Sequence, residues 1–70
     1  MIIFTQHAKD RMEERGILRE EIRKVIENPD YIFRESDGRV IVRKKSGVKE
    51  IEIVYIIENS KKIILTCYFL

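Results

Sequence analysis

The feature that most limits the fold of this chain is its shortness, because 70 residues must form a stable structure without covalent help. A domain of about 60 residues buries only about 60% of the surface that its unfolded chain exposes, so its core is small. The chain has one cysteine and one histidine, so neither a disulfide nor a cysteine–histidine zinc site is expected. Its 13 isoleucines beside a single glutamine resemble the composition of thermophile proteins. We therefore expect one domain over residues 1–70, stabilised by an isoleucine-rich core or by a partner subunit.

Charge and hydropathy exclude several broad classes of protein. Charged residues make up 37% and hydrophobic residues 44%, which is a globular rather than a disordered balance. The net charge of +2 is a weak signal for nucleic acid, but residues 31–70 hold eight basic and five acidic side chains, so any attraction for phosphate is expected in that half. The longest apolar runs are far shorter than the ~20 residues of a membrane-spanning helix, and no signal peptide is visible. We expect a cytoplasmic protein that has no membrane partner.

The sequence pattern predicts that helices come first and strands follow. Thr5 is expected to cap a helix over residues 6–15 that ends at Gly16, and apolar residues at helical spacing predict a second helix over residues 19–28. Strands are predicted over residues 1–4, 31–35, 39–45, 50–58 and 62–69, the last four joined by hairpin-type turns. The predicted fold is α+β, with an N-terminal strand and two helices packed on a C-terminal antiparallel four-stranded meander.

Alternation along the predicted strands assigns their side chains to two faces. In the last strand, one face is expected to hold Ile63, Leu65, Cys67 and Phe69, and the other Ile64, Thr66 and Tyr68. The more apolar face of each strand should lie under the helices, with Tyr55 and Cys67 in the core. The uncovered face is then expected to be basic, with these side chains: Arg39, Arg43, Lys45, Glu52, Val54, Thr66 and Tyr68. Such a face suits a phosphodiester ligand.

Two residues of the first predicted helix are candidates for phosphate chemistry. His7 and Arg11 stand one helical turn apart. Histidine is the side chain whose ordinary pKa lies nearest neutrality, so it is a natural general acid or base, and arginine stabilises the charge of a reacting phosphate. The alternative is that His7 caps or packs the helix and that Arg11 pairs with Glu14.

The last three strands supply further candidates. Arg43, Lys44 and Lys45 form the densest basic run, which predicts phosphate binding; the alternative is a solvated hairpin whose charges discourage aggregation. Thr66 and Tyr68 present hydroxyl groups, and Tyr68 is suited to stack a base or move a proton, or else reflects ordinary strand propensity. The sequence has no metal-ligand set and no phosphate-binding glycine loop. If the protein is an enzyme, the expected chemistry is therefore acid–base catalysis without a metal or other cofactor, of which cleavage of RNA by its own 2′-hydroxyl is the commonest example.

Four segments of the first half, Phe4–Ala8, Arg11–Ile17, Glu20–Ile22 and Val25–Pro29, resemble the bacterial and archaeal domain-of-unknown-function family 4258. Gly38-Arg39 and Ile64–Tyr68 are similar to its second half, so the resemblance covers nearly the whole chain. That family is similar in layout to the RelE-like and BrnT-like toxins of toxin–antitoxin modules, which are small α+β ribonucleases. The resemblance implies site residues at the matching positions: His7, Arg11, Arg39, Thr66 and Tyr68. Arg19 departs from the family pattern, in which a serine or threonine cap is usual.

These observations lead to two hypotheses of different classes. The first is a small metal-independent ribonuclease toxin, with RNA and a cognate antitoxin protein as partners. Its catalytic residues would be His7, Arg11 and Tyr68, and its substrate-binding residues Arg39, Arg43, Lys45 and Thr66. The alternative is a non-catalytic module that binds RNA or a protein, including a homodimer formed through a strand edge or the uncovered sheet face.

Overall fold

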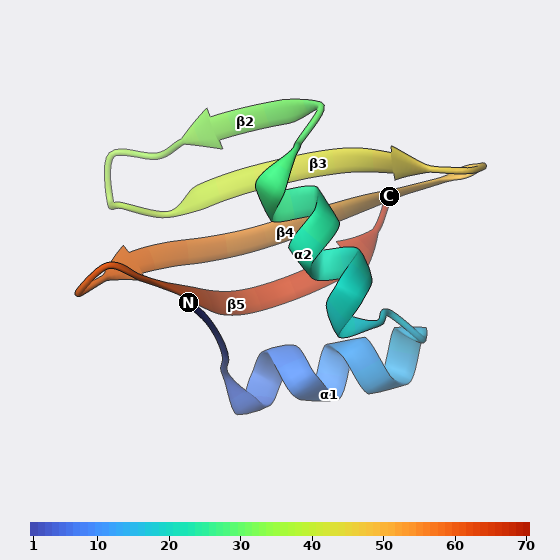
Figure 1. Cartoon of the computed structure of the whole chain (residues 1–70), viewed down its shortest axis with the longest axis horizontal. Helices are drawn as coiled ribbons and strands as arrows, with labels where there is room; N and C mark the ends of the chain where they lie inside the picture. Colours follow the sequence, from blue (N-terminus) through green and yellow to red (C-terminus); the bar gives the residue numbers. More distant parts are fainter.

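Two helices pack on one face of a five-stranded mixed sheet in the computed structural model, which describes all residues 1–70 (Figure 1). The elements are β1 (Ile2–Phe4), α1 (Gln6–Arg15), α2 (Arg19–Glu27), β2 (Tyr31–Arg34), β3 (Val40–Ser46), β4 (Lys49–Glu58) and β5 (Lys61–Phe69). All predicted helices and strands are present, with bounds that differ from the predicted ones by at most one residue. The predicted α+β class is therefore confirmed.

Local capping explains where the two helices begin and end. Thr5 Oγ1 accepts a hydrogen bond from the Ala8 amide at 3.1 Å, and Gly16 ends α1 in the left-handed conformation at φ 67°. In α2, the N-cap residue Leu18 has no side chain that can cap the helix, and the Glu21 carboxylate makes the reciprocal bond of a capping box by accepting from the Leu18 amide at 2.9 Å. Neither helix has the length and apolar content that crossing a membrane requires.

The sheet contains the predicted meander and one further strand. Its order is β1-β5-β4-β3-β2, and β2 to β5 are antiparallel neighbours, as expected. The prediction of a four-stranded sheet is corrected by β1, which pairs in parallel with β5 and places Ile3 opposite Ile63. Parallel pairing of so short a strand needs a non-local partner, which the local pattern of residues 1–4 does not reveal.

Helix α1 continues along β5 where β1 stops, at the lower side of the sheet in Figure 1. Thr5 donates to the Ile64 carbonyl from both its amide, at 3.2 Å, and its hydroxyl, at 2.8 Å. Arg15, in the last turn of α1, donates from Nη1 to the Cys67 carbonyl at 2.9 Å. These bonds satisfy backbone groups of β5 that a free strand edge would expose, and they leave the short strand β1 as the edge strand on this side.

A β-bulge in β5 decides which of its side chains enter the core. Val54 lies opposite Thr66 and Tyr55 opposite Ile64, so Leu65 is an extra residue without a partner. The alternation therefore shifts by one, and Ile64 is 0% exposed beside Cys67, while Ile63 turns to the uncovered face. The prediction that Ile63 and Leu65 share a face with Cys67 is wrong for this reason.

The core lies between the helices and the helix-facing side of β3, β4 and β5. Tyr55 and Cys67 are buried in it, as predicted. The other fully or nearly fully buried apolar residues are Ala8, Met12, Ile17, Ile22, Val25, Ile26, Val40, Val42, Ile51, Ile53 and Ile64. Isoleucine supplies six of these thirteen core residues, in agreement with the isoleucine-rich core that the composition predicts.

Candidate functional site

The face of the sheet opposite the helices, hereafter the open face, carries the candidate site. Strand pairing and alternation place these residues on it: Ile3, Tyr31, Phe33, Ile41, Arg43, Lys45, Glu50, Glu52, Val54, Ile56, Ile63, Thr66 and Tyr68. One row across four strands is polar, since Tyr31 pairs with Arg43, Arg43 with Glu52, and Glu52 with Tyr68. Residues directly opposite one another in such a ladder have Cβ atoms about 4.5–5.5 Å apart, so neighbours in this polar row are within reach of each other.

The centre of the polar row is an ion pair between β3 and β4. Arg43 Nε donates to Glu52 Oε1 at 2.5 Å, and the hydrogen bond raises the pKa of Arg43 above its ordinary value. Glu52 is 4% exposed and is the one charged residue that is buried. The Arg43 guanidinium also lies over the Tyr31 ring, 4.9 Å from the ring centre. A buried carboxylate held by a single arginine is a costly arrangement, which makes it a candidate for function as well as structure.

Three further predicted residues share the open face with Arg43. Tyr68 belongs to the polar row. Thr66 lies opposite Val54 in the row on one side of it, and Lys45 lies opposite Glu50 in the row on its other side. The expected basic character of this face is not observed, however. Glu50 and Glu52 stand opposite Lys45 and Arg43, so acidic and basic side chains balance here.

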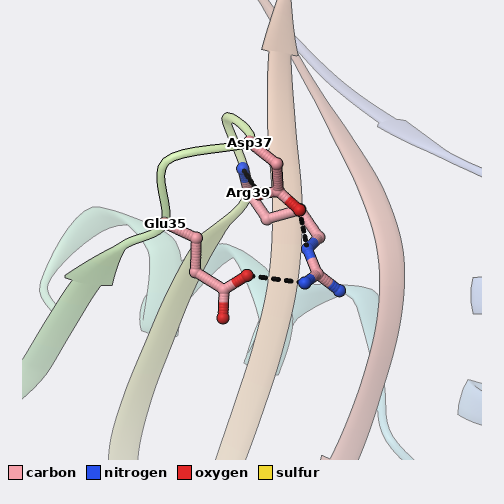
Figure 2. A network of polar contacts seen from close by, with 3 residues as sticks. All are labelled: Glu35, Asp37 and Arg39. Atoms are coloured by element: carbon pink, nitrogen blue, oxygen red, sulfur yellow. Dashed lines mark hydrogen bonds and ion pairs between the residues drawn. The ribbon is translucent and has the colours of Figure 1, made fainter.

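Arg39 is held in the turn between β2 and β3 by two carboxylates (Figure 2). Its Nε donates to Asp37 Oδ2 at 2.9 Å and its Nη2 to Glu35 Oε2 at 2.6 Å. The negative charges of Asp37 and then Glu35 raise the pKa of Arg39. A guanidinium neutralised in this way holds its own turn together, and it lies outside the polar row.

The two candidates on α1 are not joined to the polar row. His7 is exposed in the first turn of the helix, and its side chain makes no hydrogen bond or ion pair. Arg11 is paired with Glu14, and its Nη1 donates to Glu14 Oε2 at 2.7 Å, which matches the alternative given for it. No hydrogen bond or ion pair connects either residue to Tyr68, so the three expected catalytic residues do not form one contact network.

Lys44 points away from the open face. It donates from Nζ to the Asn28 carbonyl at 2.9 Å, at the end of α2, and lies 3.7 Å from Asp30 Oδ1. The alternation of β3 thus divides the basic run, with Arg43 and Lys45 on one side and Lys44 on the other. The three cations do not act as one patch.

A large part of the open face is apolar. Phe33, Ile41 and Val54 form the row next to the polar row, and Ile56 and Ile63 pair beyond it. Phe33 is 49% exposed although it belongs to a strand. An uncovered group of this kind is more typical of a protein-contact surface than of a solvated sheet.

The helix side holds a separate hollow of about 550 Å³ between α2 and the start of the sheet. Phe4 lines it together with Arg19 and Lys62, and the Arg19 guanidinium lies 4.7 Å from the centre of the Phe4 ring. None of the predicted site residues lines this hollow. The candidate site and this hollow are therefore on opposite faces of the sheet.

Sequence reasoning missed two members of the polar row, Glu52 and Tyr31, as site residues. Alternation does place Glu52 on the uncovered face. Its position between Arg43 and Tyr68 depends on the register of three strands, which no local pattern specifies. For Tyr31 the sequence indicates only an aromatic residue at the start of a predicted strand, which does not by itself point to a site.

Comparison with known proteins identifies the family without assigning an activity. The family described as "Domain of unknown function (DUF4258)" matches residues 4–69 of the chain. No curated protein and no solved structure matches it. The family match includes every candidate residue discussed above, from His7 to Tyr68, and the chain belongs to the DUF4258 family.

Proposed function

We propose that this protein is a small metal-independent ribonuclease of the toxin type, whose substrate lies on the open face. The observation that carries the proposal is the polar row, because it sets a cation, a buried carboxylate and a phenol side by side. Cleavage of RNA by its own 2′-hydroxyl needs a group that accepts a proton, a group that returns one, and a cation at the phosphate. Three neighbouring side chains of the polar row supply these functions.

Arg43 is suited to hold the phosphate while it stays bonded to Glu52. It contacts Glu52 through Nε, and neither Nη nitrogen has a hydrogen-bond partner within the chain. Its side chain is 39% exposed, so the Nη groups are accessible to two phosphate oxygens from the open face. Lys45 and Thr66, in the flanking rows, are placed to bind neighbouring nucleotides.

Glu52 and Tyr68 are assigned the proton transfers. The Glu52 carboxylate takes the proton of the 2′-hydroxyl, whose oxygen attacks phosphorus and forms a 2′,3′-cyclic phosphate. The bond from phosphorus to the 5′-oxygen breaks, and the Tyr68 hydroxyl gives its proton to that oxygen. A proton passed from Glu52 back to Tyr68 restores both groups, and the tyrosine ring offers a surface on which a base can stack.

Induced expression in bacteria, followed by analysis of total RNA, tests this proposal. Wild type should arrest growth and produce RNA fragments with cyclic phosphate ends. The purified protein should produce the same fragments in the presence of a metal chelator. Glu52→Gln and Tyr68→Phe should each lower the cleavage rate by roughly 100-fold or more. Arg23→Lys, on the exposed side of α2, is the control. His7→Ala and Arg11→Ala in the same assay test the roles that the family resemblance implies for α1.

Intact RNA and unimpaired growth from a folded wild type would contradict the ribonuclease proposal. The second candidate function, a module that binds a protein partner, would then be favoured. The apolar row of Phe33, Ile41 and Val54 supports it, because no helix covers this row and Phe33 is 49% exposed beside the polar row. Under the toxin proposal the same apolar row would receive the antitoxin.

A further inference from the structure

The hollow on the helix side has the size and the lining of a small-molecule site. Its volume of about 550 Å³ falls in the range of ~300–1,000 Å³ that is usual for ligand pockets. Three parts of the chain meet there: β1 with Phe4, α2 with Arg19 and Glu27, and the β4–β5 turn and β5 with Ser60 and Lys62. The hollow therefore combines an aromatic ring, both signs of charge and a hydroxyl group.

Two cations of the hollow are free to bind an anion. Neither the Arg19 guanidinium nor the Lys62 ammonium makes a hydrogen bond or an ion pair within the chain. Their contacts are with rings instead: the Arg19 guanidinium lies 4.7 Å from the centre of the Phe4 ring, and Lys62 Nζ lies 5.8 Å from the centre of the Tyr55 ring. A cation over a ring keeps its N–H donors unused. Because Arg19 belongs to α2 and Lys62 to β5, an anion in the hollow meets positive charge from two elements.

The one acidic residue of the lining offers the hollow a second kind of polar contact. Glu27 has no ion-pair partner, whereas the third cation of the lining, Arg23, is held by Glu20 at 3.4 Å. The two unpaired cations, Arg19 and Lys62, thus outnumber the unpaired carboxylate, so the hollow favours an anion. The Glu27 carboxylate only accepts hydrogen bonds, and it suits a ligand that also carries O–H or N–H donors.

Ser60 has a backbone conformation that favours glycine. Asn59 and Ser60, the central residues of the β4–β5 turn, have φ values of 52° and 63°. Two positive φ values are typical of a type I′ turn, in which Asn-Gly is a preferred pair. Asparagine tolerates this conformation, but serine adopts it only at a cost. Because Ser60 lines the hollow, the strained position coincides with a hydroxyl group at the candidate site.

We propose that this hollow binds a free mononucleotide. Arg19, Lys62 and the Ser60 hydroxyl hold its phosphate group. The Glu27 carboxylate accepts hydrogen bonds from the ribose hydroxyls, and the base packs against the Phe4 side of the hollow, since bases stack on aromatic rings. A mononucleotide matches the whole lining, because it carries an anion, hydroxyl donors and a flat ring. The site lies on the opposite side of the sheet from the open face, so it does not depend on the ribonuclease proposal.

Titration calorimetry of the full chain with adenosine 5′-monophosphate (AMP) tests the site, with adenosine and inorganic phosphate as partial ligands. AMP should bind, and each partial ligand should bind roughly 10-fold more weakly or worse, because it lacks either the anion or the ring. In amide NMR spectra, the signals of Ser60 and Lys62 should move most on addition of AMP. No binding of AMP, adenosine that binds as tightly as AMP, or signal changes confined to the polar row would overturn the proposal.

Variants test the roles of single residues in the same titration. Arg19→Gln should weaken AMP binding about 10-fold. Its matched control is Arg34→Gln, which removes the same charge from an exposed, unpaired arginine on β2, at the opposite edge of the sheet from β1, and should leave the affinity unchanged.

Ser60→Gly separates binding from stability. It should raise the midpoint of thermal unfolding, because glycine adopts a positive φ without strain, and yet it should weaken AMP binding, because the hydroxyl is lost. A residue that serves only the turn would not show opposite changes of this kind. Equal losses of affinity in Arg19→Gln and Arg34→Gln, or unchanged AMP binding in Ser60→Gly, would contradict the proposed site.

Discussion

Arg43 and Glu52 face each other directly on β3 and β4, joined by a 2.5 Å hydrogen bond from Nε to Oε1 on the side of the sheet that no helix covers. The carboxylate is buried, and the guanidinium that shields it is 39% exposed. A ligand that binds Arg43 therefore acts on the hydrogen bond that holds Glu52. This coupling makes the pair the first target for mutation.

Replacement of Arg43 by Gln should destabilise the fold, because it leaves a buried carboxylate without its partner. The free energy of unfolding, measured in urea, should fall by roughly 1–3 kcal/mol. Glu52→Gln should cost less, since the amide oxygen still accepts from Arg43 Nε. A double-mutant cycle that gives additive losses would show that the two side chains are energetically independent.

The β-bulge at Leu65 predicts opposite behaviour for two adjacent isoleucines. Ile64→Ala empties a site that is 0% exposed, so it should lower the free energy of unfolding by about 2–4 kcal/mol. Ile63→Ala, on the open face, should lower it by less than half of that amount. Equal losses in urea unfolding, or a larger one at Ile63, would contradict the bulged register.

Thr5 serves both the start of α1 and the edge of β5, so its removal should cost more than the loss of an ordinary cap. Thr5→Ala deletes the bond from the Ala8 amide and the hydroxyl bond to the Ile64 carbonyl. The expected loss is about 2 kcal/mol in thermal or urea unfolding. Thr5→Ser should keep most of the stability because it retains the hydroxyl. The exposed Ser36→Ala is the neutral control.

Stability should decrease at low pH through two exposed aspartates. A hydrogen bond from the Lys45 amide lowers the pKa of Asp30 below 3.8, and one from the Arg39 amide does the same for Asp37. A carboxyl whose pKa is lower in the folded state stabilises the fold above its unfolded pKa, and this contribution is lost as pH falls through the folded pKa. The urea midpoint should therefore drop as pH falls below 3.8, and less steeply in Asp30→Asn and Asp37→Asn. The same slope in both variants as in wild type and the control Glu13→Gln would contradict this.

The Cys67 thiol should react with thiol reagents only when the fold opens. It is 0% exposed, and burial raises its pKa, so the reactive thiolate is both hidden and disfavoured. At mildly alkaline pH, labelling of the native protein should be slow, and it should become fast in urea. Because the folded pKa is raised, the fold is also expected to lose stability as pH rises above the thiol's unfolded value. Rapid labelling without denaturant would contradict the buried position of Cys67.

Much of the secondary structure could be predicted because its causes are local. Thr5 and Gly16 bound α1 through capping bonds made within a few residues of the chain, and the spacing of Ile22, Val25 and Ile26 suffices to define the buried side of α2. Alternation along β3 and β4 correctly assigned Tyr55 to the core and Glu52 to the open face. These features depend on dihedral preferences and periodicity, which consecutive residues of the chain determine.

The remaining features depend on which distant residues become neighbours. The pairing of β1 with β5, the bulge at Leu65 and the alignment of Glu52 between Arg43 and Tyr68 are set by packing and register across strands. A one-residue shift moves a side chain to the opposite face, so alternation assigned Ile63 wrongly once Leu65 dropped out of the ladder. The sequence by itself thus determined the elements and most of the core, while only the tertiary structure decided which polar side chains meet. Contacts of that kind bring together residues far apart in the chain, and no local preference encodes them.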